Sequence, residues 1–276
     1  MNLPMKNETI INAKKGFTLN LKEFWLYREL LYFLAWRDLK VRYKQTVLGA
    51  LWAVIQPFVT MFIFSIFFGR VAGIGSGDIP YPIFVYTGLL FWTYFSSSLG
   101  GISSCLLGSQ NLIQKVYFPR LILPFSTTIV YLVDLFFASL VFVALMVYYH
   151  FIPTLIGILL IIPCLFITFL SFTGLGLILA AINVKYRDVR YALPFFLQTL
   201  IFVTPVIYAT SILGKYQWLF YFNPMSGVIE TMRAGLLGTG AINWWLLGAS
   251  AVFGIIIFFL GIIYFRKTEK YFADLI

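Results

Sequence analysis

Asp134 is the residue of this chain whose type and place could do chemistry. It is the one acidic or basic side chain inside six long stretches of sequence that are otherwise uncharged. An ionised carboxylate in hydrocarbon is costly unless it is paired or faces water. Such a group therefore either serves transport or gating, or makes a structural hydrogen bond between helices, for instance to Ser or Thr, with the acid ionised or protonated. Both interpretations stay open from the sequence.

Signatures of enzyme chemistry are missing from the rest of the chain. The phosphate-binding pattern G-x-x-x-x-G-K-[ST] does not occur, so this chain is not expected to use ATP by itself. His150 is the lone histidine, and Cys105 and Cys164 lie in apolar stretches without the spacing of metal ligands. We therefore expect no catalytic residue, no metal site and no cofactor in this chain.

The uncharged stretches are long enough to cross a membrane. A spanning helix needs roughly 20 apolar residues because it rises about 1.5 Å per residue across a hydrocarbon core of about 30 Å. The chain is 61% hydrophobic and only 11% charged, which argues against a water-soluble fold. Prolines inside these stretches predict kinked helices. The six predicted spans are residues 46–69, 82–107, 121–149, 153–182, 191–212 and 243–265.

Basic side chains are divided very unequally between the two sides that six spans define. The chain has 20 Lys and Arg residues and a formal net charge of +10. Only Arg70, Lys215 and Arg233 fall on one side, and the other 17 fall on the side of the two ends. Because cytoplasmic loops carry an excess of Lys and Arg, both termini are predicted to be cytoplasmic. The basicity is assigned to topology and membrane lipids, with no nucleic-acid partner.

Two further segments are expected to lie at the membrane without crossing it. Residues 21–44 interleave aromatic and charged side chains, which favours a helix along the cytoplasmic interface over a soluble cytosolic helix. Residues 213–242 are apolar but contain Lys215, Glu230 and Arg233, and a seventh span there would place the basic tail outside. We predict an outer re-entrant or surface-lying helical hairpin at this point.

The predicted architecture is an all-α integral membrane protein with six transmembrane helices. The first 20 residues lack an apolar stretch long enough for a signal peptide, so the N-terminus is expected to be retained. We expect one domain, residues 1–276. It divides into a cytoplasmic N-terminal segment with the interfacial helix (1–45), six spans (46–265) and a cytoplasmic tail (266–276).

Three cytoplasmic segments resemble the permease family of polysaccharide ABC exporters, which includes O-antigen, capsule and teichoic-acid transporters. The most specific is residues 37–52, RDLKVRYKQTVLGALW, a basic interfacial helix that turns into the first span. Residues 111–120, NLIQKVYFPR, are similar to the family's first cytoplasmic loop, and residues 183–189, NVKYRDV, to its second. The tail, residues 265–276, is also similar to that of the family.

This resemblance implies a mechanism. Such a permease is a homodimer bound to two copies of an ABC ATPase subunit, which binds ATP and magnesium. It exports a lipid-linked polysaccharide, O-antigen foremost, from cytoplasm to periplasm across the bacterial inner membrane. The residues implied to couple to the ATPase are Asn111, Gln114, Lys115, Tyr117, Phe118, Pro119 and Arg120, and those implied at the interface and cytoplasmic gate are Arg37, Arg42, Tyr43, Arg187 and Asp188.

Some roles stay open. Residues 111–120 could instead be an ordinary basic loop. Residues 183–190 either contact the ATPase or the glycan, or form a local salt bridge such as Arg187 with Asp188. Aromatic rings in the second span could line a sugar path, because sugar C–H faces stack on rings, although such rings also anchor spans at the interface. These rings are Tyr86, Phe91, Trp92, Tyr94 and Phe95.

Two other functions compete with polysaccharide export. The same fold could export a drug, a lipid or another small molecule. An integral-membrane transferase or a channel that needs no ATP is the third possibility, motivated only by Asp134 and the polar outer segment.

Overall fold

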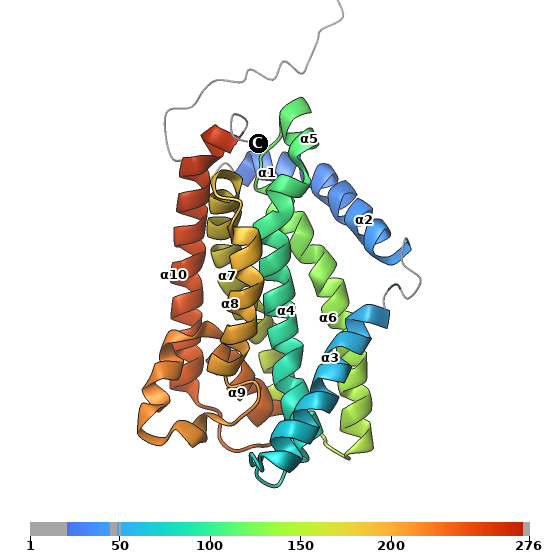
Figure 1. The fold of residues 1–276 in the computed structure, drawn as a ribbon, viewed down its shortest axis with the longest axis vertical. Coiled ribbons are helices and arrows are strands. Elements are labelled where there is room, and N and C mark those ends of the chain that lie inside the picture. Colours follow the sequence, from blue (N-terminus) through green and yellow to red (C-terminus); the bar gives the residue numbers. More distant parts are fainter. Residues whose placement is uncertain (1–20, 45–48, 50, 273–276) are drawn as a thin grey trace, which may run out of the picture.

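The protein is all-helical in the residues that the structure describes. The computed structural model describes residues 21–44, 49 and 51–272. These residues contain no β-strand longer than an isolated bridge. Long helices stand side by side in a bundle, and α1, α5 and the end of α10 lie together at one end of it (Figure 1). The helices are α1 (Leu21–Leu26), α2 (Arg28–Lys44), α3 (Leu51–Phe64), α4 (Tyr81–Gly108), α5 (Gln110–Lys115), α6 (Ile122–Tyr148), α7 (Leu155–Lys185), α8 (Val189–Val203), α9 (Pro224–Leu237) and α10 (Trp244–Thr268), with a π-helix η1 (Ser65–Val71) and the 3₁₀ segments η2 (Thr210–Phe222) and η3 (Glu269–Tyr271).

Four helical segments are long and apolar enough to cross a membrane. They are α3 with η1, α6, α7, and α10 with η3, and they contain 21 to 31 residues each. They match the predicted spans 46–69, 121–149, 153–182 and 243–265 to within a few residues at each described end. The chain is therefore a membrane protein with several apolar helices.

The second predicted span corresponds to α4, which is less apolar than those four. It contains no charged residue, but Ser, Thr, Gly and Tyr dilute its hydrophobic content. Eighteen of its 28 residues are buried by the surrounding helices. A helix inside the bundle does not face lipid, so small polar residues can hydrogen-bond within it: Thr87 Oγ1, for instance, donates to the carbonyl of Ile83 at 2.8 Å.

The fifth predicted span, residues 191–212, is wrong at its end because α8 stops at Val203. Thr204 has an extended backbone, with φ −87° and ψ 139°. Thr204 precedes Pro205, and a residue before proline is pushed out of the helical region, while the proline itself lacks an N–H. The expected kink at this proline is instead a complete break.

Two short helices occupy the segment predicted as a helical hairpin. Asn223 separates η2 from α9, and its side chain caps α9 by accepting a hydrogen bond from the N–H of Met225 at 3.0 Å. Gly238 ends α9 in the left-handed conformation, with φ 71°. Nearly every residue of α9 is buried. It contacts α7 closely, since a Cβ on Gly157 would overlap the backbone of Gly235.

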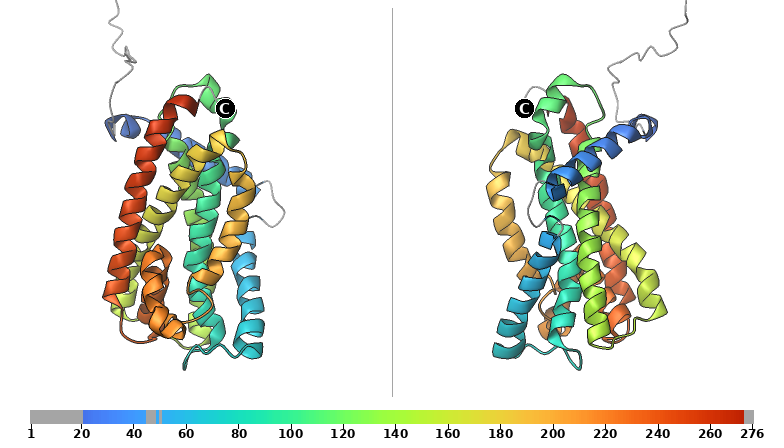
Figure 2. Two further views of the ribbon diagram at one scale, coloured as in Figure 1. Left: turned by 60° about the vertical axis from the view of Figure 1, so that its left-hand side comes forward. Right: turned by 90° about the vertical axis from the view of Figure 1, so that its right-hand side faces the viewer.

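The N-terminal helical region crosses α6 obliquely (Figure 2). The helical prediction for residues 21–44 is confirmed as α1 and α2, and within α2 only Leu34 and Ala35 are buried. Tyr32 stacks on Trp36 with ring centroids 6.4 Å apart, and the Lys40 ammonium lies 5.4 Å from the Trp36 ring centroid. This exposed aromatic and basic face has the composition of an interfacial helix. Predictions for residues 1–20, 45–48, 50 and 273–276 lie outside the described residues.

Candidate functional site

Residues 110–120, called the α5 segment below, present polar side chains outward. The segment consists of the short helix α5 and the turn that leads to α6, and it lies at the same end of the bundle as the end of α10 (Figure 1). Ile113 and Phe118 point inward, with 6% and 4% of their surfaces exposed. Tyr117 is 60% exposed. The seven predicted coupling residues thus divide into an exposed group, Asn111, Gln114, Lys115 and Tyr117, and a group that fixes the segment to the bundle, Phe118, Pro119 and Arg120.

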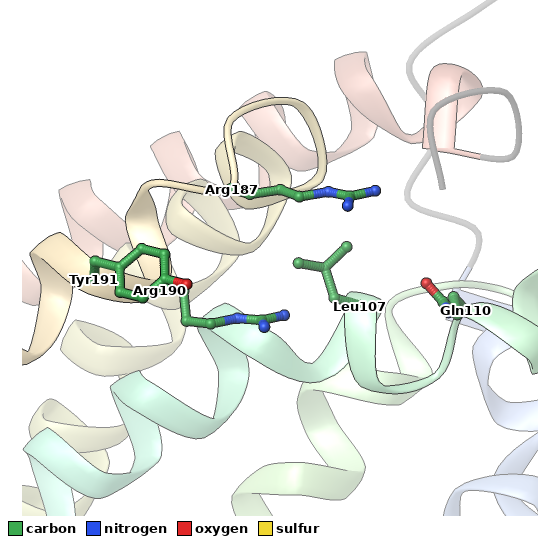
Figure 3. A pocket seen from close by; sticks show the side chains of 5 residues that line it. All are labelled: Leu107, Gln110, Arg187, Arg190 and Tyr191. Carbon is green, nitrogen blue, oxygen red and sulfur yellow. The ribbon is translucent and has the colours of Figure 1, made fainter.

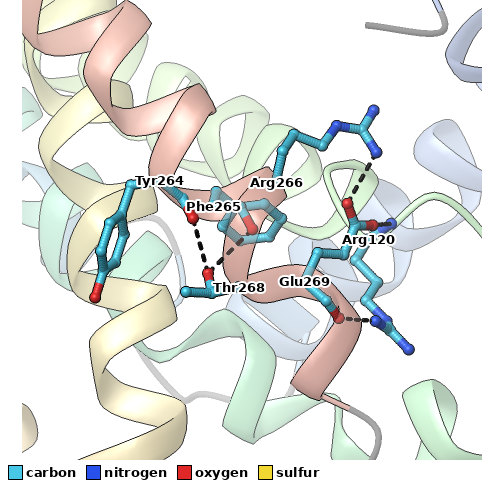
Figure 4. Close-up of polar contacts among 6 residues, drawn as sticks. All are labelled: Arg120, Tyr264, Phe265, Arg266, Thr268 and Glu269. Carbon is cyan, nitrogen blue, oxygen red and sulfur yellow. Dashed lines mark hydrogen bonds and ion pairs between the residues drawn. The ribbon is translucent and has the colours of Figure 1, made fainter. Parts of the chain in front are cut away.

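Arg120 is bound to the last helix of the same chain (Figure 4). Its backbone N–H donates to Glu269 Oε1 at 3.2 Å, and its Nη1 donates to the Glu269 carbonyl. Arg266 Nη1 pairs with Glu269 Oε2 at 2.8 Å. The Arg120 guanidinium also lies 6.0 Å from the ring centroid of the buried Phe272. The end of the α5 segment is therefore tied to the end of α10.

Asp134 joins two of the predicted gate residues. It accepts a hydrogen bond from Arg42 Nη2 at 2.5 Å and another from the Tyr43 hydroxyl. Arg42 also lies over the Tyr131 ring, 4.9 Å from its centroid. The sequence left an interhelical hydrogen bond as one interpretation, and the structure shows one, with charged and phenolic partners in place of Ser or Thr. The carboxylate lies about 18 Å along α6 from Ile122, so the end of α2 reaches the middle of that helix.

Tyr43 keeps its proton in this arrangement. Burial raises the pKa of the Tyr43 hydroxyl well above its usual range, and the hydrogen bond to Asp134 acts in the same direction. The hydroxyl is therefore a donor at every physiological pH. Arg37, by contrast, takes no part in this cluster, since it pairs with its exposed neighbour Asp38 at 2.8 Å.

Arg187 and Asp188 do not form the local salt bridge that one interpretation expected. The ion pairs among the described residues are Arg37 with Asp38, Arg42 with Asp134, and Arg266 with Glu269. Arg187 instead extends over a pocket of about 360 Å³ between the end of α4 and the start of α8 (Figure 3). The pocket is lined by Leu107, Gln110, Arg187, Arg190 and Tyr191.

The five aromatic residues proposed to line a path lie inside the bundle. Each is at most 5% exposed. Tyr86 stacks on Phe142 of α6 at 6.3 Å and donates to the Ala138 carbonyl at 3.0 Å, and Tyr94 contacts Phe172 of α7 edge to face at 5.0 Å. In this conformation neighbouring helices cover the rings, and the lining role stays a prediction. The five are Tyr86, Phe91, Trp92, Tyr94 and Phe95.

Arg233, which lies in the segment predicted as an outer helical hairpin, is a buried charged residue. It is 1% exposed, and its guanidinium lies 3.7 Å from the centroid of the Phe84 ring. Its donors satisfy carbonyls of α4 and of the break after α8. These are Phe84 at 3.2 Å, Pro205 at 2.7 Å, Val206 at 2.5 Å and Tyr208 at 3.2 Å. The sequence feature that could have predicted this buried site was an arginine within an apolar segment that follows a broken span.

Metal ligands are not grouped in the part of the chain that the structure describes. There, no three His, Cys, Asp or Glu residues come together in a way that could hold an ion.

The sequence matches that of known transporter proteins over most of its length. Residues 29–237 match the family described as ABC-2 type transporter. The chain is 33% identical over 219 residues to the O-antigen export system permease protein RfbA of Myxococcus xanthus, covering 78% of this chain and 82% of that protein. It is 29% identical over 251 residues to RfbA of Klebsiella pneumoniae, covering 90% and 95%. The polysialic acid transport protein KpsM of Escherichia coli is 24% identical over 243 residues, covering 85% and 91%.

Proposed function

The chain belongs to the ABC-2 type transporter family, and on this basis we propose that it is the membrane subunit of an ATP-driven exporter of lipid-linked polysaccharide, with O-antigen as the first candidate cargo. The relatives named for O-antigen and polysialic acid support this class of cargo. The direction of transport is from cytoplasm to periplasm. The sequence has no phosphate-binding loop of its own, so a partner ATPase with bound ATP and magnesium supplies the energy.

Six spans follow if α4 and α8 are added to the four apolar segments. α4 runs the length of the bundle between other helices (Figure 1), and α8, about 22 Å long, continues into the break and η2. Both ends of the chain then lie on one side. That side carries the basic residues of α5, of the start of α8 and of the end of α10, which supports a cytoplasmic location. η2 and α9 form the outer re-entrant hairpin. The protein as a whole lies in the inner membrane of a bacterium.

The α5 segment is the proposed docking surface for the ATPase, and the single observation that carries this proposal is its division into two faces. Lys115 and Tyr117 are exposed, as basic and aromatic anchors of an interface would be. Arg120 bonds to Glu269 at the end of α10, and Phe118 belongs to the buried cluster that contains Phe265 and Phe272, so a push on the outer face would move α4, α6 and α10 together. Two such chains, each with one ATPase subunit, would form the complete exporter.

A co-purification experiment tests this function. A tagged chain is isolated from its own bacterium, and the partner ATPase and the surface polysaccharide are both measured. We expect the wild-type chain to recover an ATPase with a phosphate-binding loop, and K115A/Y117A to lose at least tenfold of it. The matched control is K215A/Y216A, a Lys and Tyr pair that is also exposed.

Two outcomes would contradict the proposal. Recovery of no ATPase, together with unchanged surface polysaccharide after deletion of the gene, would overturn it entirely. Unchanged polysaccharide with altered drug efflux would instead favour the same fold working on a small molecule.

A further inference from the structure

The pocket between α4 and α8 holds two arginines that have no ion-pair partner among the described residues. Figure 3 shows Arg187, from the turn before α8, and Arg190, from the first turn of α8, extending toward Leu107 and Gln110. Neither guanidinium forms a hydrogen bond or an ion pair with another described residue. Asp188 lies between them in sequence but does not line the pocket. Two guanidinium groups held near one cavity without a carboxylate are arranged to meet an anion from outside the chain.

The donor set fits phosphate oxygens. A guanidinium presents its N–H groups as a planar fork, which matches phosphate in two-point contacts. Gln110 adds an amide and Tyr191 adds a hydroxyl at the same pocket. Two fixed positive charges match a diphosphate ester better than a single phosphodiester, because the diphosphate carries about one more negative charge.

The surroundings of the pocket fit a lipid that carries such a group. Tyr191 is 77% exposed at the pocket, and farther along α8 Phe195 and Phe196 are 71% and 63% exposed. An apolar chain could lie along this face while its charged head stays at the basic end of the bundle. Sugars are commonly joined to carrier lipids through phosphate or diphosphate esters, so a lipid-linked glycan combines these features in one molecule.

We propose that Arg187 and Arg190, with Gln110, bind the diphosphate group of the lipid-linked cargo, an inference that rests on the function proposed above. Gln110 is the first residue of α5, the proposed ATPase docking segment. A bound diphosphate would therefore bridge the start of α8 and the base of α5. Occupancy of the pocket would stimulate ATP hydrolysis by the partner.

Binding of a polyprenyl diphosphate is the direct test. The complex of this chain with its ATPase is placed in nanodiscs of phosphatidylcholine, and the affinity for the probe is measured by native mass spectrometry. We expect R187Q/R190Q to weaken binding at least tenfold and to abolish stimulation of ATP hydrolysis by the probe, and Q110A to weaken binding a few-fold. R187K/R190K keeps the positive charges but lacks the planar guanidinium groups that make two-point contacts, so it should bind with intermediate affinity.

Matched controls separate this site from general basicity. K185Q/K267Q removes two exposed charges outside the pocket and should bind the probe like the wild type. A neutral polyprenol should not bind at the pocket, and phosphatidylglycerol, an ordinary anionic lipid, should compete only weakly. Equal affinity for phosphatidylglycerol would overturn the assignment to cargo, and unchanged binding by R187Q/R190Q would overturn the site.

Failure of the site and failure of the proposed function give different results. A complex that hydrolyses ATP but binds no polyprenyl diphosphate contradicts the diphosphate site alone. A chain that recovers no ATPase contradicts the proposed function before the probe is added.

Discussion

Asp134 and Arg233 are two charged residues in the helical bundle, and the protein accommodates them in different ways. Asp134 meets a cation and a hydroxyl from another helix, and its partner Arg42 keeps 41% of its side chain exposed. Arg233 has no carboxylate partner among the described residues and donates to four backbone carbonyls. Its five N–H donors match a set of carbonyls left over where α8 breaks.

This difference indicates different mechanical roles. The bonds of Arg233 run to backbone atoms of α4 and of the break, so they hold α9 in one place. The bonds of Asp134 run between side chains of α2 and α6, and Arg42 can exchange its carboxylate for water. We therefore expect the first arrangement to be rigid and the second to separate more easily, which leaves both the gating and the structural interpretation of Asp134 to be tested.

Arg233→Met should have the largest effect on stability. It removes the Arg233 donor from the carbonyls of Pro205, Val206 and Tyr208 in the break after α8, and unsatisfied buried groups cost roughly 1–3 kcal/mol each. We expect a loss of at least about 3 kcal/mol, seen as loss of the monodisperse peak when heated detergent extracts are analysed by size-exclusion chromatography. Arg70→Met, at an exposed arginine, is the control and should change little. Equal melting of the two variants would show that the carbonyls are satisfied without Arg233.

Asp134→Asn should have a smaller effect on stability and a large effect on transport. Arg42 is partly exposed and can be hydrated, so we expect a loss of about 2 kcal/mol, with α2 released from α6. Export should fall although the protein is inserted normally. A double-mutant cycle with Arg42→Gln measures the pair directly, and we expect a coupling of about 1 kcal/mol. Additive losses and unaltered export would reduce Asp134 to a packing residue.

Tyr43→Phe should have the smallest effect of the three. It removes one hydrogen bond to Asp134 and leaves the ion pair, so we expect a loss of about 1 kcal/mol. In the unfolded chain the Tyr43 hydroxyl is mostly protonated below about pH 10. Burial raises its pKa further in the folded chain, so both states keep the proton over this range. The loss should therefore be the same at pH 6 and pH 9. Tyr32→Phe, at an exposed ring, is the control.

The sequence could predict the helices well because each depends on a local property. Apolar stretches of suitable length, free of charge except for Asp134, predicted α3, α4, α6, α7 and α10, since an apolar helix has to be buried in lipid or protein. The early end of α8 was also predictable, because Thr204 precedes Pro205. The uncharged residues that follow Pro205 led the predicted span to be extended to residue 212.

The partners of the charged residues could not be predicted in the same way. Asp134 was recognised from its position, but Arg42 lies 92 residues away in sequence. Arg233 was assigned to the predicted outer hairpin without a partner, and its partners are carbonyls 25 to 149 residues away. Arg187 had two interpretations, and only the positions of the side chains excluded the salt bridge with Asp188. Contacts of this kind depend on how helices are rotated against one another.

The sequence by itself determined that Asp134 needs a partner, contact with water or a proton, and that the chain is a helical membrane protein. Hydrophobicity acts on each stretch separately, so it can be read along the chain. Only the tertiary structure decided that Arg42 and Tyr43 are the partners and that Arg233 supports the break after α8. It also decided that Arg187 and Arg190 pair with no carboxylate in the described part of the chain. Hydrogen bonds act only over about 3 Å, so the packing of the helices decides which of them form.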